Sequence, residues 1–497
     1  MYRTPSWTKN IKERGGIIIP VIAFATISIL ILSGFVGWAT GSVRLARKSE
    51  YRERALQIAE AGIDYYRWHL AHAPTDYKDG TGVAGPYVHP FYDDQGVKVG
   101  QFSLGIVAPP LGSTLVTVTS TGTVDIDPKV KRVIQAKFAK PSFAKYAALS
   151  NSLIQFGGGT EVWGPVHANG GLAFYGIAMH NLVTSALTTY LDPTTGNTEW
   201  AVHQFTPQDA LPPGAWLGTT TGKFPAGRNL GVPAVDFAGI TVDLTAMKAL
   251  AAADGTDYGA SGSGLGYHVV LQVNDTFDLY RVDTLVAQPG GCNVAIRYQN
   301  ASDANCTAVA PNSMWSINTQ TLIGNDVPFP PNGIMFFGDH VWIDGTINTA
   351  RITVVAATIP ATAKNIIVNN DLRYTDKVLG NDVIGLIAQN DVLIGFNSLD
   401  TLEVDAAIIA QNGRLHRLNY GSACGAAYQR NTVNFFGMFA TAQRYALSTS
   451  GGSCPSNPSS SGYSTRDFTY DTNLLYGPPP SFPLTADQYQ IISWDEQ

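Results

Sequence analysis

Charged residues are scarce in this chain of 497 residues: Asp, Glu, Lys and Arg make up 14% of it, against about 25% in an average soluble protein. The net charge of −6 offers no basic surface, so we expect no nucleic-acid partner. The 50 glycines and 28 prolines indicate many turns. Sparse charge combined with many turns favours a rigid, β-rich body over a disordered one.

The motifs of common enzyme classes are absent as well. The chain contains no His-Glu-x-x-His and no Gly-x-Ser-x-Gly, and the glycine-rich stretch 259–266 lacks the lysine and the helix of a phosphate loop. Asn369 and Asp371 form an Asn-x-Asp match, but a turn explains them better. The densest charge group is interpreted as a solvated face and comprises Asp400, Glu403, Asp405, Arg414, His416 and Arg417. We therefore predict no enzyme, no catalytic residue, no metal site and no cofactor.

Cysteine is rare, and none of it occurs as Cys-x-x-Cys, which argues against zinc. The four cysteines are Cys292, Cys306, Cys424 and Cys454. In an exported protein an even number suggests disulfides. Pairing of sequence neighbours, Cys292 with Cys306 and Cys424 with Cys454, would close two surface excursions rich in Gly, Ser and Asn. The two other connectivities and four free thiols remain open.

Against this background, one long apolar run dominates the N-terminal region. Ile17 to Ala39 contains no charged residue and would form a helix of roughly 33 Å, enough to cross a bilayer core. Three interpretations compete: a signal peptide cleaved near Ala39-Thr40-Gly41, a permanent anchor, and a leader of residues 1–16 removed at a glycine. The basic segment ending in Gly15-Gly16 directly before Ile17 favours the third.

The helix is predicted to continue beyond the apolar run, to residue 74, where Pro74 ends it. Apolar and small side chains recur at steps of three and four residues, which places them on one helical face. This face consists of Ala55, Ile58, Ala59, Gly62, Tyr66 and Leu70. Residues 17–74 would then form one helix of roughly 80 Å, half apolar and half amphipathic.

At this point residues 10–75 resemble PilX-type minor pilins and related prepilin-like proteins of type IV pili. The resemblance lies in the basic-Gly-Gly junction, the apolar span and Gln57-Ile58-Ala59-Glu60-Ala61-Gly62. The glutamate that most major pilins carry five residues into the mature helix is replaced here by Pro20 or Val21, depending on which glycine is cut. The resemblance implies a membrane protein that assembles with other pilin-like subunits through its N-terminal helix, with the face defined above as assembly surface.

The remaining chain is predicted to be mainly β, which makes the fold class α+β. Alternating runs within 86–140 predict a small antiparallel sheet packed on the helix. From 146 to 447, short apolar runs end at Asn169, Asn370, Asn390 and Asn412, and the last three are spaced by about 20 residues. This repeat predicts a right-handed parallel β-helix; a β-sandwich is the alternative.

Two segments are expected to depart from the repeat. Residues 180–265 are interpreted as an excursion that holds one helix from Asp243 to Asp254, with Asp243 and Gly255 as caps. Residues 448–497 are interpreted as a C-terminal tail strapped onto the head, or else as a mobile terminus. We also expect residues 75–497 to fold without the helix.

These observations predict a membrane-anchored, pilin-like surface protein with an extracellular body, contributing as a minor pilin to type IV pilus assembly or adhesion. This hypothesis includes a surface or glycan ligand of the head. The alternative is a membrane-anchored carbohydrate-binding or carbohydrate-active β-helix, which a cluster of carboxylates in a groove would favour.

Overall fold

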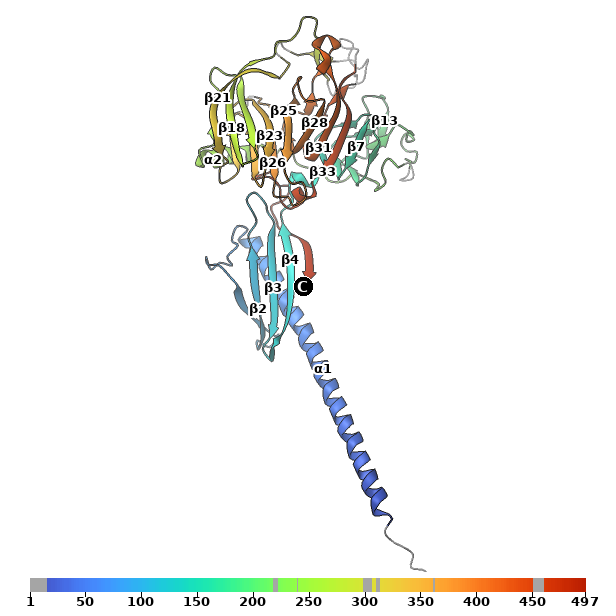
Figure 1. Ribbon diagram of the computed structural model, residues 1–497. Helices are drawn as coiled ribbons and strands as arrows, with labels where there is room; N and C mark the ends of the chain where they lie inside the picture. Colours follow the sequence, from blue (N-terminus) through green and yellow to red (C-terminus); the bar gives the residue numbers. More distant parts are fainter. Residues whose placement is uncertain are drawn as a thin grey trace, which may run out of the picture. The chain divides into compact units, whose positions relative to one another are not determined.

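The computed structural model describes residues 16–217, 222–238, 240–297, 306–309, 313–360, 363–449 and 460–497. The chain divides into two compact units (Figure 1). Unit 1 comprises residues 1–107, 117–137 and 493–497, and unit 2 comprises residues 108–116 and 138–492. Gly15 and the rest of the expected leader before Gly16 lie outside the described residues, so cleavage at this junction stays a prediction.

The long helix is confirmed. Helix α1 spans Ile18–His72 without a break, and its 55 residues correspond to about 80 Å. Pro20 lies in the first turn, where the missing N–H has no partner within the helix anyway. At the other end the N–H of Ala73 donates to the carbonyl of His69 at 2.8 Å, and Pro74 follows.

The small antiparallel sheet of unit 1 is also confirmed. Its strands lie in the order β1 (Tyr87–Tyr92), β2 (Lys98–Val107), β3 (Val116–Val124), β4 (Asp127–Ala139) and β34 (Gln490–Glu496) (Figure 1). Buried and half-buried residues alternate along β3, as the period of two predicts. The buried side of this sheet faces the second half of α1.

Two glycines let the helix approach the sheet closely. A Cβ on Gly62 would come within 2.3 Å of the Ser120 hydroxyl, and one on Gly122 within 2.0 Å of the Ala55 carbonyl. A larger residue at Gly122 would require a backbone shift, and one at Gly62 would require the Ser120 and Phe102 side chains to move. The helix backbone therefore rests directly on strand β3.

Unit 2 is built on three ladders of parallel strands. The first ladder runs, in spatial order, through β16 (Asp257–Tyr258), β22 (Ile334–Phe337), β24 (Arg351–Ala356), β26 (Val383–Ala388), β28 (Thr401–Ala410), β31 (Gln429–Thr441), β5 (Ala148–Ser150), β8 (Val166–Ala168), β11 (Val183–Ser185) and β15 (Arg228–Leu230). The second contains β17 (Gly266–Gln272), β23 (Val341–Ile347), β25 (Ile366–Tyr374), β27 (Val392–Ile394) and β29 (Leu415–Arg417), and separately β6 (Ile154–Phe156), β9 (Leu172–Phe174) and β14 (Val202–Gln204). The third joins the ends of β23 and β25 to β28, β31, β33 (Ser461–Tyr470), β7 (Thr160–Trp163) and β10 (Ala178–Met179).

The other strands of unit 2 pair antiparallel, and short 3₁₀ helices connect several elements. β18 (Thr276–Leu285) lies between β17 and β21 (Ile317–Pro328), β12 (Thr189–Leu191) pairs with β13 (Thr198–Trp200), and β32 (Ser448–Thr449) pairs with β33. β19 (Val294–Arg297) lies between β20 (Cys306–Ala308) and β30 (Asn419–Tyr420). The 3₁₀ helices are η1 (Phe143–Lys145), η3 (Ser422–Cys424), η4 (Ala426–Tyr428) and η5 (Thr472–Leu475).

Spatial order and chain order differ in these ladders. β31 pairs with β5, and β33 pairs with β7, so residues 148–230 extend the ladders beyond the C-terminal strands. Helix α2 (Ile240–Ala253) lies in the connection from β15, at one end of the first ladder, to β16, at the other. It begins three residues before Asp243, which is therefore inside the helix and not its cap, whereas Gly255 follows its end with a φ of +74°.

Two predicted segments differ from the structure. The expected excursion 180–265 contains β11, β14 and β15, which belong to the ladders. The expected tail 448–497 supplies β33, an internal strand of the third ladder, and β34, the last strand of the sheet in unit 1. Both strands satisfy backbone groups that would otherwise be left unpaired at a strand edge.

The core of unit 2 lies on both sides of its central strands. Every side chain of β26 is buried, as are those from Val404 to Ala410 in β28. Strands covered on both faces read as continuous apolar runs, which explains why their sequences do not alternate. Leu244 and Met247 of α2 cover part of one face.

Three of the four predicted turn asparagines occupy one kind of position. Asn169, Asn390 and Asn412 each follow a first-ladder strand by one or two residues. Asn370 differs, because it lies inside β25. The Asn390 amide donates a hydrogen bond to the side-chain oxygen of Asn365, the residue directly before β25, at 3.0 Å.

The predicted disulfide between Cys292 and Cys306 is wrong. Cys292 bonds to Cys424, which is 132 residues away, with a Cα–Cα distance of 4.4 Å. The pairing of β19 with β30 brings the two segments together, a contact that spacing along the sequence does not reveal. Cys454 lies outside the described residues, as does the side chain of Cys306.

Candidate functional site

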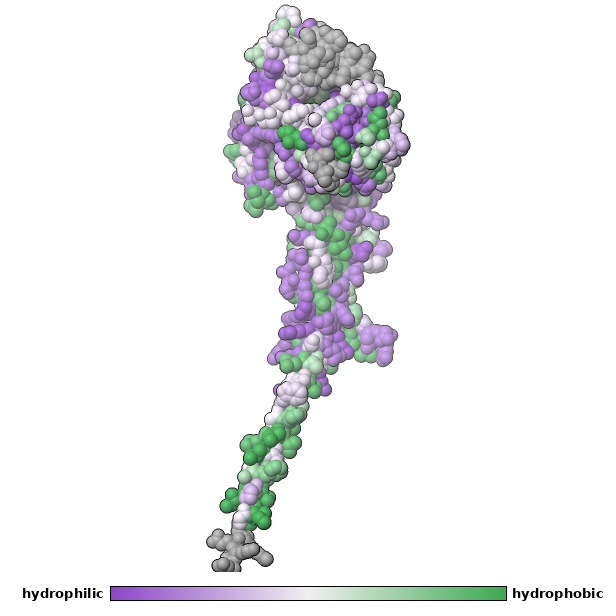
Figure 2. All heavy atoms as spheres, turned by 90° about the vertical axis from the view of Figure 1, so that its right-hand side faces the viewer, coloured by the Kyte–Doolittle hydropathy of each residue, from purple (hydrophilic) through white to green (hydrophobic). Residues whose placement is uncertain are grey.

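The first half of α1 is an apolar surface without a protein partner in unit 1. Figure 2 shows hydrophobic spheres along this part of the helix. Its large apolar side chains are all more than half exposed: Ile18, Ile19, Val21, Ile22, Phe24, Ile27, Ile29, Leu30, Ile31, Leu32, Phe35, Val36 and Trp38. Among the described residues, α1 is the one helix long and apolar enough to cross a membrane. Gly16 and Ile17, which flank the predicted cleavage site, lie directly before it.

The predicted assembly face occupies the other half of the helix and is not free. Ala55, Ile58, Ala59, Gly62, Tyr66 and Leu70 are all buried, together with Ile63. They pack on the chain's own sheet, with Gly62 against Phe102 and Ser120. The three- and four-residue spacing identified a buried face correctly, but this face belongs to the core of unit 1. The surface open to other molecules is the apolar half.

The charge group interpreted as a solvated face is largely buried. Asp405 is fully buried, and Arg414, His416 and Arg417 are buried as well. The Arg417 guanidinium lies over the Tyr420 ring at 4.9 Å and donates to the carbonyls of Phe396 and Ala427. Burial lowers the pKa of Arg417. Arg417 therefore holds the loops that contain Phe396 and Ala427 together.

One hollow of about 450 Å³ on the third ladder carries several carboxylates, and we call it the acidic hollow. Its lining includes Glu161, Glu403, Asp405, Asp467 and Trp163. Glu161 and Asp467 are direct partners across β7 and β33, and burial together with the Glu161 charge raises the pKa of Asp467.

The acidic hollow is already partly neutralised. Glu161 accepts from the His180 ring at 2.7 Å, and Lys377 contacts Asp405 at 2.7 Å. Glu403 and Asp405 were noted in the sequence as part of a solvated face, but their proximity to Glu161 and Asp467 was missed. Glu161 and Asp467 are 306 residues apart, and strand register alone brings these residues together. No set of three or more potential ligands for a metal ion occurs in the described ranges.

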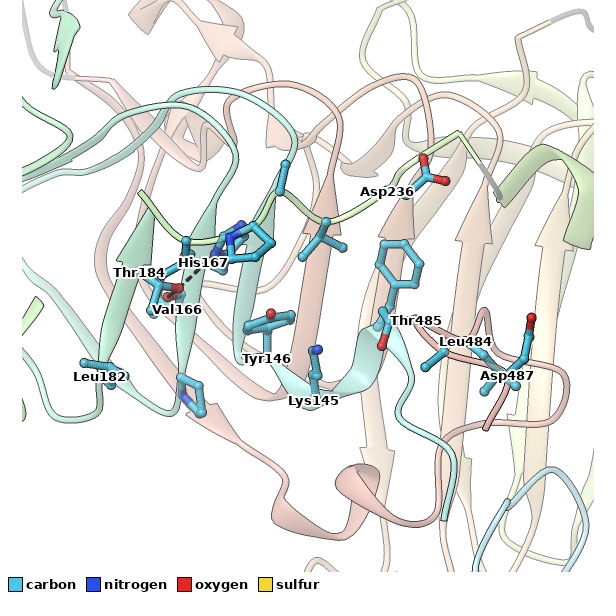
Figure 3. A pocket seen from close by; sticks show the side chains of 17 residues that line it. Lys145, Tyr146, Val166, His167, Leu182, Thr184, Asp236, Leu484, Thr485 and Asp487 are labelled. Atoms are coloured by element: carbon cyan, nitrogen blue, oxygen red, sulfur yellow. Dashed lines mark hydrogen bonds between the residues drawn. The ribbon is translucent and has the colours of Figure 1, made fainter. Parts of the chain in front are cut away.

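A second hollow, of about 800 Å³, lies on the outer side of β8 and β11, and we call it the lysine cleft. Figure 3 shows Lys145 and Tyr146 entering it from the end of η1, with His167 and Thr184 from the two strands. The Lys145 ammonium lies over the Tyr146 ring at 5.1 Å. Burial lowers the pKa of Lys145 and raises that of Tyr146.

The walls of the lysine cleft are held in place by hydrogen bonds. Asn169 binds the segment 232–236 twice: its amide donates to the carbonyl of Val235 at 2.7 Å, and its oxygen accepts from the Val235 N–H at 2.8 Å. On the opposite wall, the N–H of Thr485 donates to the carbonyl of Pro141 at 2.9 Å. Asn169, predicted as a turn residue, therefore also fixes one wall.

Comparison with known proteins gives little further information. No protein-family model matches the chain, and no curated protein matches it. Among solved structures, the competence-associated pilin ComZ from Thermus thermophilus is similar at 14% identity, over 90% of this chain and 97% of that chain, with a TM-score of 0.33.

Proposed function

We propose that this chain is a membrane-anchored, pilin-like surface protein that acts as a minor pilin in type IV pilus assembly or adhesion. The supporting observation is the division of α1 into two halves. From Ile18 to Val43 the helix exposes only apolar and small residues, and its second half is a layer of unit 1, packed on an antiparallel sheet. A soluble monomer has no use for such an exposed apolar half.

The energetics support an assembly role for the apolar half. Burying one large aliphatic or aromatic side chain is worth about 1.5–3 kcal/mol, so thirteen of them favour lipid or neighbouring helices over water by tens of kcal/mol. Hydrophobic burial against other subunits could replace the bilayer when the subunit leaves it. We therefore propose membrane and pilin-like subunits as the partners of this helix.

We further infer that unit 2 is a right-handed parallel β-helix displayed outside the cell. The three parallel ladders support a coil, since each turn of such a coil contributes one strand to each ladder. The Cys292–Cys424 disulfide supports an oxidising location, because structural disulfides are rare in reducing compartments. A surface ligand for this head belongs to the same proposal.

The mature N-terminus tests the proposed processing. Mass spectrometry of the protein from membranes should find Ile17 as the first residue, or Gly16 if cleavage follows Gly15. Replacing Gly16 with Leu should leave the leader attached, whereas Gly34→Ala, within the helix, should not affect cleavage. A mature protein that begins at Ser42 would instead indicate signal peptidase and remove the pilin-like interpretation.

A second candidate function, a carbohydrate-active protein, is favoured by the acidic hollow alone. Paired carboxylates with one raised pKa are the chemistry that glycoside hydrolysis uses. Incubation with acidic and neutral polysaccharides, followed by a reducing-end assay, tests this alternative. Release of reducing ends that is lost in Asp467→Asn would support it, and the prediction that the chain is no enzyme would then be wrong.

A further inference from the structure

The lysine cleft has the size and the stability of a preformed binding site. Its volume of about 800 Å³ is within the range of small-molecule sites, roughly 300–1,000 Å³. Both walls are fixed to the body of unit 2 through Asn169 on one side and Thr485 on the other. A ligand would therefore find the cleft already open, without the entropic cost of ordering a loop.

Among the polar groups of the lysine cleft, the Lys145 ammonium is available to bind a ligand. Thr184 and Asn169 already occupy both ring nitrogens of His167, at 2.8 and 3.0 Å. Burial lowers the pKa of His167, which disfavours the charged form of its ring. Lys145, by contrast, forms no ion pair within the described part of the chain; its ammonium contacts the Tyr146 ring, and no acid contributes to its pKa. Among the described lining residues, the half-buried Lys145 ammonium is thus the one charge in the floor of the cleft without an opposite charge.

The two carboxylates that line the lysine cleft, Asp236 and Asp487, do not neutralise Lys145. Both are exposed at the rim of the cleft, and Figure 3 shows both away from the Lys145 side chain. Burial alone accounts for the lowered pKa of Lys145, with no contribution from a nearby acid. A ligand carboxylate would supply the missing partner, and charge-assisted hydrogen bonds of this kind are the strong ones.

The rest of the lining determines the body of the ligand. Apart from the groups already named, the lining is mostly aliphatic and aromatic: Phe143, Pro165, Val166, Leu182, Val232, Pro233, Ala234, Val235, Leu484 and Ala486. Such a surface offers few partners for hydroxyl groups, and leaving them unpaired would cost binding energy. The ring of Tyr146 beside Lys145 offers a flat face for a ring attached to the carboxylate.

We propose that the lysine cleft binds a small organic carboxylate with an apolar ring, the carboxylate on Lys145 and the ring against Tyr146. This site is independent of the pilin-like function, because it involves no residue of α1. Phenylacetate is a suitable probe, 2-phenylethanol is its neutral analogue, and glucuronate is a polar ring carboxylate. Isothermal titration with the full chain in lipid nanodiscs, with empty nanodiscs as blank, measures binding of each.

Phenylacetate should bind saturably with one site per chain, and 2-phenylethanol should bind at least tenfold more weakly. Lys145→Met should weaken phenylacetate binding about 10- to 100-fold, the loss expected for one charge-assisted hydrogen bond. Lys145→Arg should restore most of the affinity, and Lys129→Met, at an exposed position of β4, should leave it unchanged. The melting temperature of each variant shows whether it is folded.

Three results would overturn the proposal. The absence of saturable phenylacetate binding, or equal binding by wild type and a folded Lys145→Met variant, would remove Lys145 as an anion-binding residue. Tighter binding of glucuronate than of phenylacetate would refute the apolar body of the ligand. None of these results would bear on membrane anchoring or processing of the N-terminus.

Discussion

The stability of unit 1 should depend on the second half of α1 and not on the first half. Two N-terminal deletions separate these contributions, one of residues 1–42 and one of residues 1–74. Among the described residues, the shorter deletion removes side chains that are almost all exposed, so residues 43–497 should be soluble, monomeric and folded. The longer deletion removes a complete layer of unit 1, and its sheet should lose stable structure.

The expected loss follows from the burial of four large side chains. Ile58, Ile63, Tyr66 and Leu70 are at most 3% exposed, all against the sheet. At about 1.5–3 kcal/mol for each, their removal costs on the order of 8 kcal/mol. A whole domain is usually stable by only about 5–15 kcal/mol. The earlier expectation that residues 75–497 fold without the helix is therefore revised.

Hydrogen exchange read by mass spectrometry provides the assay. Amides of β2 and β3 should be strongly protected in the full chain and in residues 43–497, and should exchange fast in residues 75–497. Amides of β26, in unit 2, serve as the internal reference. Equal protection of β3 in both fragments would show that the sheet is stable without the helix, and the layer argument would be refuted.

Three further predictions concern the anchor, the disulfide and a buried histidine. Ile29→Arg should weaken insertion of α1 by about 3 kcal/mol, roughly a hundredfold, so less protein should pellet with membranes than for Ile29→Leu, and equal pelleting would contradict this. Cys292→Ser opens a loop of 132 residues and should lower the free energy of unfolding by on the order of 5 kcal/mol. A non-reducing peptide map should join Cys292 to Cys424, and linkage of Cys292 to another cysteine would refute the fold around β19. Burial lowers the pKa of His340 to about 4 from the usual value near 6.5. Between pH 6.5 and 4 the unfolded chain therefore binds a proton at this residue that the folded chain does not bind. The free energy of unfolding of the wild type should fall by up to about 3 kcal/mol as the pH falls from 6.5 to 4. His340→Asn should show a shallower loss over the same window in urea titrations, and identical slopes would exclude this role.

Features set by local composition could be predicted from the sequence. Two signals predicted the bounds of α1 almost to the residue: the uncharged run from Ile17 to Ala39, and the apolar and small residues that recur every three or four positions after it. Alternation predicted the strands of the small sheet in the same way. In both cases the signal repeats within one element, so neighbouring residues carry all the information.

Features set by distant pairing could not be predicted. Cys424 meets Cys292 only because β30 pairs with β19, and Glu161 meets Asp467 only through the register of β7 on β33. Asn370 was wrongly predicted to be a turn residue from its spacing of 20 residues to Asn390. This spacing does not reveal that Asn370 lies inside a strand, β25. Arg417 was read as exposed because a charge is usually solvated, whereas aromatic rings and loop carbonyls surround it here.

The order of the ladders makes the C-terminal region part of the structure of both units. Strands β5 and β7 precede most of unit 2 in the chain, yet they pair with β31 and β33, about 290 and 306 residues later. Long-range pairing of this kind is slow, because the entropy of closing the loop is lost before the contacts form. The chain also passes between the units after residues 107, 116, 137 and 492, so no single cut separates them. Unit 2 can therefore be completed only when β33 has been added, and the sheet of unit 1 only when β34 has been added. A chain that lacks these C-terminal strands would leave strand edges unpaired in both units.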